Sequence, residues 1–404
     1  MRIILSLVML FVCHDMLHAR SEKRLSKPKN VWQLGPFIRE DKANPIITPN
    51  ANSLFFCPIQ RKEIQWEGDH TFNPGAVVHE GKVYLLYRAE DNYGKGIGRH
   101  TSRIGLAEST DGIHFTRSAA PVLYPSADDQ QAFEWPGGCE DPRIVQSEDG
   151  TFIMTYTQWT CFNDDKPEEK RNIPLLAIAT SKDLRSWHKH GYAFAQSKLG
   201  PVHSKSGSIV CRLVEERLVP VKIQDKYWMY WGDGPISAAT STDLIHWEPI
   251  LDSQGGPLAV LDKRPGTFDS ELVEAGPPAL LTHQGIVLLY NGKNSKEKGD
   301  PHLSAGAYSA GQVLFDSSNP LQVRMREGSS FFKPERAFEK TGQYESGTVF
   351  IEGLVRFKGQ WFLYYGAADS AIGVAVERKH KLKNGKDTAF QEIKAANKSK
   401  GKRR

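Results

Sequence analysis

Residues 73–115 read NPGAVVHEGKVYLLYRAEDNYGKGIGRHTSRIGLAESTDGIHF, and this stretch contains the unit that decides the fold. It begins with a turn of small residues that leads into an apolar strand. An aromatic strand ending at Tyr87 follows, and then a strand of small residues that runs into Asp111 and Phe115. Short apolar runs separated by Gly, Asp, Asn and Pro are typical of strands and turns, and no part of the sequence shows a sustained helical period.

The same unit occurs five times along the chain. The units begin at residues 73–77, 140–144, 205–209, 274–278 and 345–349. Their aromatic strands end, at intervals of 69, 74, 60 and 75 residues, at Tyr87, Tyr156, Tyr230, Tyr290 and Tyr365. A sheet unit repeated at this length indicates radial repetition, so the sequence predicts an all-β fold, a five-bladed β-propeller over residues 45–377. Because the ends of such a ring must meet, we expect residues 31–60 to complete or seal the last blade.

The charge of the chain is unevenly distributed. Residues 378–404 contain 11 Lys and Arg against 2 Asp and Glu, and residues 1–30 contain 6 against 2. The total of +5 therefore leaves −8 for residues 31–377. An acidic body argues against a nucleic-acid partner, since binding phosphates needs a basic groove. We expect residues 378–404 to be a basic, solvated tail.

The N-terminus has the pattern of a secretion signal. Arg2 precedes an apolar run over residues 3–13, and Ala19 is a small residue suited to a cleavage site. The run is shorter than the roughly 20 residues that a membrane-spanning helix needs. We therefore expect a signal peptide at 1–19, an N-terminal segment at 20–44, and a mature protein that is secreted or periplasmic, with no membrane partner.

The repeat also predicts where polar residues gather, because corresponding loops of a propeller lie at one mouth of its central channel. An isolated carboxylate at a turn is usually a cap, but ionisable residues recur at this position in every unit. A carboxylate-rich cleft with Trp and Tyr faces suits a carbohydrate. The His residues show no metal-ligand spacing, and nucleophile-elbow and dinucleotide motifs are absent from the sequence, so we expect no metal and no cofactor. The candidate site residues are Asn73, Arg88, Asp91, Asp141, Arg143, Lys205, Asp233, Glu271, Glu274 and Asp369.

Two motifs, Glu-Asp-Pro-Arg-Ile at 140–144 and Tyr-Gly-Ala-Ala-Asp at 365–369, resemble those of glycoside hydrolase family 130. The stretches 72–75, 87–91 and 275–278 are similar to further motifs of this family of β-mannoside phosphorylases and β-mannosidases. The resemblance implies a five-bladed propeller, inversion at the anomeric carbon, and Asp141 as general acid. It also implies that the mannose subsite is lined by Asn73, Arg88, Asp91, Arg143, Lys205 and Asp369.

The sequence departs from the phosphorylase pattern at two places. Phosphorylases of the family tend to carry a His-Arg pair after the third aromatic strand, where this chain has Trp231-Gly232-Asp233, and Gly-Ala-Gly where it has Glu274-Ala275-Gly276. Two like charges about 4 Å apart cost roughly 4 kcal/mol at an effective dielectric near 20, so carboxylates there disfavour phosphate. They suit the activation of water instead.

These departures resemble the hydrolytic branch of the family, whose members act on β-1,2-linked mannose. Together with the N-terminal secretion pattern, the resemblance implies an exported, inverting β-mannosidase. Asp141 would be the acid, and Asp233, Glu274 or Glu271 the base. Two alternatives stay open: a β-1,4-mannoside phosphorylase that uses inorganic phosphate, and a non-catalytic carbohydrate-binding propeller.

Overall fold

The computed structural model describes residues 32–91, 99–160 and 173–378. The predicted signal peptide at 1–19 and all of the basic tail except Arg378 lie outside these residues. The described chain is almost entirely β: its helices are the four-residue α1 (Gln131–Glu134) and the short 3-10 turn η1 (Ala337–Glu339). No helix among the described residues has the length and apolar character needed to cross a membrane. The prediction of an all-β fold is therefore confirmed.

The strands pair antiparallel in groups that follow the chain. One group contains β4 (His70–His79), β5 (Lys82–Glu90), β6 (Ser102–Ser109) and β7 (Thr116–Arg117). The next contains β8 (Gly138–Gln146), β9 (Phe152–Trp159), β10 (Leu175–Ser181) and β11 (Trp187–Tyr192). A third contains β12 (Ser208–Val214), β15 (Lys226–Trp231), β17 (Ile236–Ser241) and β18 (Trp247–Pro249).

Two further groups complete the body. One contains β21 (Ala279–Thr282), β22 (Gly285–Lys293), β23 (Tyr308–Phe315) and β24 (Val323–Arg326). The other contains β25 (Val349–Phe357), β26 (Gln360–Ala367), β27 (Ala371–Glu377) and β1 (Phe37–Arg39). Shorter strands extend these groups or stand apart: β2 (Leu54–Cys57), β3 (Lys62–Gln65), β13 (Arg217–Pro220), β14 (Lys222–Ile223), β16 (Asp233–Gly234), β19 (Ala259–Leu261) and β20 (Leu272–Ala275).

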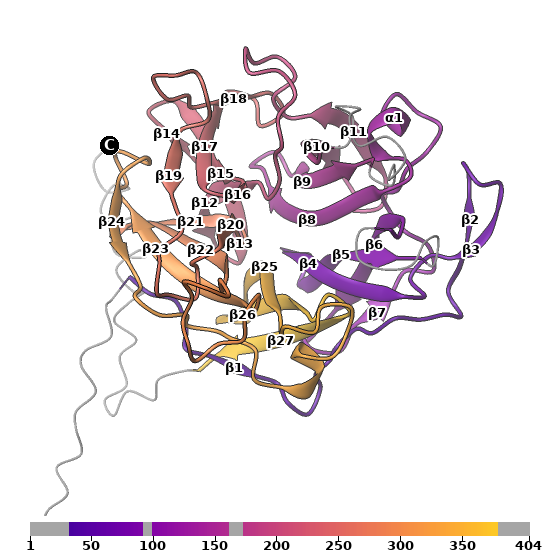
Figure 1. The fold of residues 1–404 in the computed structure, drawn as a ribbon. Coiled ribbons are helices and arrows are strands. Elements are labelled where there is room, and N and C mark those ends of the chain that lie inside the picture. The colour runs from indigo at the N-terminus through magenta and orange to yellow at the C-terminus, as the bar shows by residue number, and fades with distance from the viewer. Residues whose placement is uncertain (1–31, 92–98, 161–172, 379–404) are drawn as a thin grey trace, which may run out of the picture.

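The two ends of the body meet in the last group. Phe37 of β1 lies opposite Glu377 of β27, and a further bridge joins Ile47 to Ile372. Part of the segment 31–60 thus joins the last strands as predicted, whereas β2 pairs with β3 in a sheet of their own. Figure 1 shows the groups arranged around a common centre, with β25 to β27 beside the N-terminal strands. The pairings among the described strands form separate sheets, and the number of blades stays a prediction.

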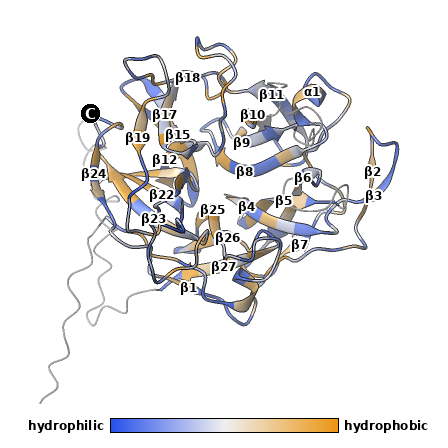
Figure 2. Ribbon diagram, viewed as in Figure 1, coloured by the Kyte–Doolittle hydropathy of each residue, from blue (hydrophilic) through white to orange (hydrophobic). Residues whose placement is uncertain are grey.

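The repeated tyrosines explain why each unit needs a strand of small residues. Tyr87 lies opposite Gly105, Tyr290 opposite Gly311 and Tyr365 opposite Gly373, and a Cβ added to any of these glycines would meet the tyrosine ring. The rings are fully buried, and their hydroxyls donate to buried acceptors such as Glu67, Asp269 and Glu339. These tyrosines are therefore core residues. Figure 2 shows hydrophobic residues along strands such as β25 and hydrophilic stretches both in the loops and on strands such as β8.

Candidate active site

Two β-bulges place the polar residues of the first two strand groups. The pairing of β4 with β5 shifts between Phe72 and Pro74, and the pairing of β8 with β9 shifts between Glu140 and Arg143. The extra residues, Asn73 and Asp141, adopt left-handed backbone conformations, with φ of 47° and 51°. Such bulges turn a side chain out of the regular alternation and are frequent beside active sites. Here they bring the two side chains into contact, because Asn73 Nδ2 donates to Asp141 Oδ1 at 2.9 Å.

A cavity of about 340 Å³ opens beside this contact. Its walls come from every strand group, as the sequence predicts for residues at corresponding loops. Six of the ten candidates line it: Asn73, Arg88, Lys205, Asp233, Glu274 and Asp369. Aromatic side chains of Phe72, Trp159, Tyr308 and Tyr344 also line the cavity. Apolar faces combined with convergent polar groups are the usual composition of a small-molecule site.

Asp141 lies at the centre of the polar cluster, with only 3% of its surface exposed. Arg88 Nη1 donates to its Oδ1 at 3.2 Å, and Lys205 Nζ lies 3.5 Å from its Oδ2. Burial acts to raise the pKa of this carboxyl, but Arg88, Lys205 and Arg143, with the Asn73 amide, outweigh it and lower the pKa. Asp141 is therefore ionised in the free protein.

Arg88 balances several carboxylates at once. Its Nη2 lies 2.6 Å from Glu90 Oε1 and 2.8 Å from Glu140 Oε1, in addition to the contact with Asp141. Its guanidinium also lies over the Phe72 ring, 4.7 Å from the centroid. Burial acts to lower the pKa of Arg88, and the carboxylates Glu140, Glu90 and Asp141 more than reverse this effect. A planar, multidentate cation can satisfy this cluster in a way that a lysine cannot.

Three other carboxyls of the site have pKa values near neutral pH. The pKa values of Glu140, Glu274 and Asp369 are each raised to about 7, and burial is the largest cause. The charge of Asp141 contributes to this rise for Glu140 and Asp369, and the charge of Arg88 opposes it. A cluster that combines an ionised carboxylate with carboxyls that titrate near neutral pH is equipped for acid–base chemistry.

One wall of the cavity carries a pair of carboxylates. Asp233 of β16 lies directly opposite Glu274 of β20, and both residues line the cavity. His203 Nε2 lies 2.7 Å from Asp233 Oδ1, and the Ser206 hydroxyl donates to Glu274 Oε1. Lys205 adds a positive charge between this pair and Asp141, and these carboxylates raise its pKa against the effect of burial.

Four of the ten candidates are absent from the cavity lining, and three of them, Asp91, Arg143 and Glu271, have partners elsewhere. Asp91 is bound by Arg103, whose Nη1 lies 2.7 Å from its Oδ2, because successive residues at a strand end point to opposite faces. Arg143 lies beneath the site, where it donates to the Ala275 and Asp141 carbonyls. Glu271 pairs with Lys293 at 2.9 Å on a more exposed surface.

The tenth candidate, Asp141, is outside the lining itself but bonded to residues that form it. The sequence analysis missed Glu352, a fully buried carboxyl whose Oε1 lies 3.0 Å from Arg143 Nη2. Burial raises its pKa well above the ordinary value. The signal was available, because Glu352 is the one acidic residue within the apolar strand VFIEGLVRF at 349–357. His203 and Gln343 were also missed, and neither carries a comparable signal.

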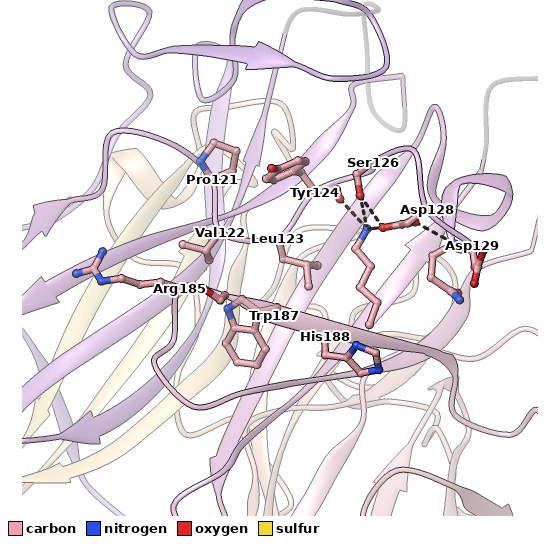
Figure 3. Close-up of a pocket in the computed structure, with 13 residues that line it drawn as sticks. Pro121, Val122, Leu123, Tyr124, Ser126, Asp128, Asp129, Arg185, Trp187 and His188 are labelled. Atoms are coloured by element: carbon pink, nitrogen blue, oxygen red, sulfur yellow. Dashed lines mark hydrogen bonds and ion pairs between the residues drawn. The ribbon is translucent and has the colours of Figure 1, made fainter.

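A larger cavity, of about 540 Å³, is lined by residues of the segment 121–130 and by residues 185–189 at the start of β11 (Figure 3). Its polar groups bind one another: Lys189 Nζ lies 2.6 Å from buried Glu134 and 3.1 Å from Asp128, whose carboxylate also accepts from Ser126. Lys189 and Asp128 of this lining are thus paired, and Arg185 lies 3.5 Å from Glu108 outside the lining. The smaller central cavity, with its excess of carboxyls, is the better candidate for chemistry.

The chain is similar to known proteins over most of its length. The family model for glycoside hydrolase family 130, described as beta-1,4-mannooligosaccharide phosphorylase, matches residues 37–384. A 1,2-beta-oligomannan phosphorylase of Thermoanaerobacter sp. (strain X514) is 33% identical over 79% of this chain and 93% of its own. A glycosyl hydrolase structure from Bacteroides ovatus is 50% identical, with a TM-score of 0.81 over 85% of this chain and 94% of that one.

A further solved structure is described by the words "The GH130 family of mannoside phosphorylases contains glycoside hydrolases that target beta-1,2 mannosidic linkages in Candida mannan". It is 50% identical to this chain, with a TM-score of 0.83 over 87% of this chain and 96% of that one. A beta-1,2-mannobiose phosphorylase structure from Listeria innocua, at 22% identity and a TM-score of 0.64, shares the fold.

Proposed function

The chain belongs to glycoside hydrolase family 130, whose members act on mannosides, and from this premise we propose that it is an inverting β-mannosidase. Its substrate would be a β-1,2-linked manno-oligosaccharide. The sequence relatives include both phosphorylases and a structure described with hydrolases, so the residues of the cavity must decide between phosphate and water as nucleophile.

The observation that carries the proposal is the facing pair Asp233 and Glu274 on the cavity wall. A phosphate at this wall would meet two carboxyls, and the nearby cation Lys205 is already placed against Asp141. Anion binding favours N–H and guanidinium donors, whereas a water molecule is activated by a carboxylate that accepts its proton. This arrangement supports hydrolysis.

The reaction assigns one role to each side of the cluster. The oxygen of water bonds to the anomeric carbon while the glycosidic C–O bond breaks, with inversion of configuration. Glu274 or Asp233 accepts the proton of water, and Asp141 supplies the proton to the leaving oxygen. Because Asp141 is ionised in the free protein, it must first gain that proton, and Glu140 and Asp369 are the neighbouring carboxyls that hold one near neutral pH.

The decisive experiment is product analysis with and without inorganic phosphate. Purified protein incubated with β-1,2-mannobiose should release mannose at the same rate in both conditions. Mannose 1-phosphate formed only in the presence of phosphate would establish the alternative, a β-mannoside phosphorylase, which the description of the family model favours. A parallel panel of β-1,4-linked oligosaccharides would test the linkage. Binding without turnover on both panels would indicate the non-catalytic carbohydrate-binding propeller.

Two structural expectations belong to the same proposal. We propose that the five strand groups are five blades around the cavity, with β1 closing the last of them. A crystal structure with another number of blades would contradict this. We also propose that the protein is exported after cleavage near Ala19, and N-terminal sequencing of the secreted protein should then lack residues 1–19.

A further inference from the structure

A second cluster of ligand-type side chains lies beside the cavity. His70 is the first residue of β4, Glu90 is the last residue of β5, and His100 precedes β6 by two positions. The register places His70 opposite Glu90, and Glu90 opposite Ser102. One potential ligand atom from each of His70, Glu90 and His100 lies within 4.8 Å of the others. Only strand pairing brings them together, since 20 and 10 residues separate them along the sequence.

The neighbours of these side chains have the arrangement expected around metal ligands. His100 Nδ1 lies 2.7 Å from the Asp91 carbonyl oxygen, so this nitrogen donates, and Nε2 keeps its lone pair. His70 Nδ1 lies 3.0 Å from Ser370 Oγ, which orients that ring. Glu90 Oε1 accepts from Arg88, whereas Glu90 Oε2 accepts the amide of Gln343 at 3.1 Å.

We propose that His70, Glu90 and His100 form a binding site for a divalent transition metal ion. Two imidazoles and one carboxylate are a ligand set that proteins use for Zn²⁺ and for Fe²⁺, with a further position open to water. Zn–N bonds of about 2.0–2.1 Å in tetrahedral geometry put ligand atoms roughly 3.3 Å apart. Binding therefore draws the three side chains closer together.

The ion would act on the wall of the cavity. Glu90 and Gln343 line that cavity, and His70 and His100 lie behind Glu90. A metal bound here joins β4, β5 and the segment that enters β6, and it fixes the carboxylate that Arg88 shares with Asp141. The site is independent of the proposed hydrolysis, because none of its three ligands has a role in bond cleavage. The alternative is that His70 and His100 have only a structural role, since their imidazole rings already pack edge to face with centroids 5.2 Å apart.

Calorimetric titration with ZnCl₂ tests the proposal on the untagged full chain after dialysis against EDTA. We expect the wild type to bind one equivalent with micromolar or tighter affinity. His70→Gln and His100→Gln should each weaken binding at least tenfold. His114→Gln is the matched control, because His114 is exposed and pairs with Asp111 outside the cluster. Equal Zn²⁺ binding by the wild type and the His70→Gln/His100→Gln double variant, or no binding by the wild type, would overturn the proposal.

A second measurement avoids any dependence on the folding of variants at buried His100. Co²⁺ bound by nitrogen and oxygen ligands in a four- or five-coordinate site absorbs visible light much more strongly than octahedral aqueous Co²⁺. The wild type should show this strong absorption at one equivalent, and one equivalent of Zn²⁺ should remove it. A spectrum that stays that of aqueous Co²⁺ would count against the site, whatever the variants do.

Discussion

Asp233 and Glu274 face each other across the antiparallel pairing of β16 with β20, so two carboxyls share one wall of the central cavity. Side chains at directly opposite positions lie about 4.5–5.5 Å apart at Cβ, and like charges there repel. Burial and the neighbouring Asp233 raise the pKa of Glu274 to about 7, although Lys205 opposes them. The pair is therefore unlike a turn cap: it holds a proton that leaves close to neutral pH.

The first prediction concerns the base. Glu274→Gln should lower kcat at least about 100-fold, the usual scale for general acid–base catalysis. If ionised Glu274 accepts the proton of water, its ionisation near pH 7 should give the wild-type pH profile an ascending limb, while loss of the protons of Glu140 and Asp369 gives a descending limb. The residual activity of Glu274→Gln should lose only the ascending limb. Asp233→Asn provides the comparison. A pH profile unchanged by Glu274→Gln but altered by Asp233→Asn would move the role of base to Asp233.

The same group predicts how stability depends on pH. Folded Glu274 titrates near 7, whereas an unfolded glutamate titrates near 4.5. Between these values the folded protein retains a proton that the unfolded chain has released, so the free energy of unfolding falls as pH rises from about 4.5 to 7 and levels above 7. One pKa unit corresponds to about 1.4 kcal/mol, which puts the effect at a few kcal/mol.

Glu274→Gln isolates this contribution from those of Glu140 and Asp369. The Tm of the variant relative to the wild type should increase between pH 5 and pH 8, because the amide cannot become a buried charge. Thermal unfolding at several pH values measures this difference directly. A Tm difference that is the same at every pH would show that the pKa of Glu274 is not raised in the folded protein.

Asp141→Asn should abolish most turnover and leave the fold intact. The amide keeps the shape and can still contact Asn73 and Arg88, but it cannot donate an acidic proton. Removing the charge of Asp141 also removes one cause of the raised pKa of Glu140, which can then ionise and balance Arg88. We expect kcat to fall at least about 100-fold with little change in Tm. Normal turnover with a lowered Tm would instead make Asp141 a turn cap.

The features that could be predicted from the sequence are those that depend on a local pattern of residues. The tyrosine that ends each aromatic strand needs a small residue on the next strand, and this rule produces a visible repeat. The bulge residues Asn73 and Asp141 were found through motifs, and the structure places them in contact.

What the sequence could not predict depends on pairing across distant strands. Asp91 follows Glu90 directly, yet strand alternation sends it to Arg103 and away from the cavity. The ionisation of Asp141 depends on cations 53 and 64 residues away, at Arg88 and Lys205. The proposed metal ligands likewise share no motif, because only the register of β4, β5 and β6 makes His70, Glu90 and His100 neighbours.

The last prediction tests how closely the strands that carry the site must approach. A Cβ added at Gly75 of β4 would collide with the carbonyl oxygen of Pro142 and lie 3.4 Å from the Cα of Arg143. Both obstacles are backbone atoms, which cannot turn aside like a side chain. Gly75→Ala should therefore force β4 away from β8 and cost about 1–3 kcal/mol, the usual range for overpacking.

The same movement would lengthen the contact between Asn73 and Asp141, so Gly75→Ala should lower Tm and kcat together. Gly328→Ala is the matched control. An added Cβ there meets no heavy atom within 4 Å, and Gly328 is not among the glycines with positive φ. The control should keep the wild-type rate and lose no stability, since the substitution acts chiefly by reducing the conformational entropy of the unfolded chain. Thermal unfolding and initial rates on both variants make the comparison. A Gly75→Ala protein with wild-type Tm and kcat would mean that β4 and β8 have room between them, and that the Asn73–Asp141 contact does not depend on this close approach.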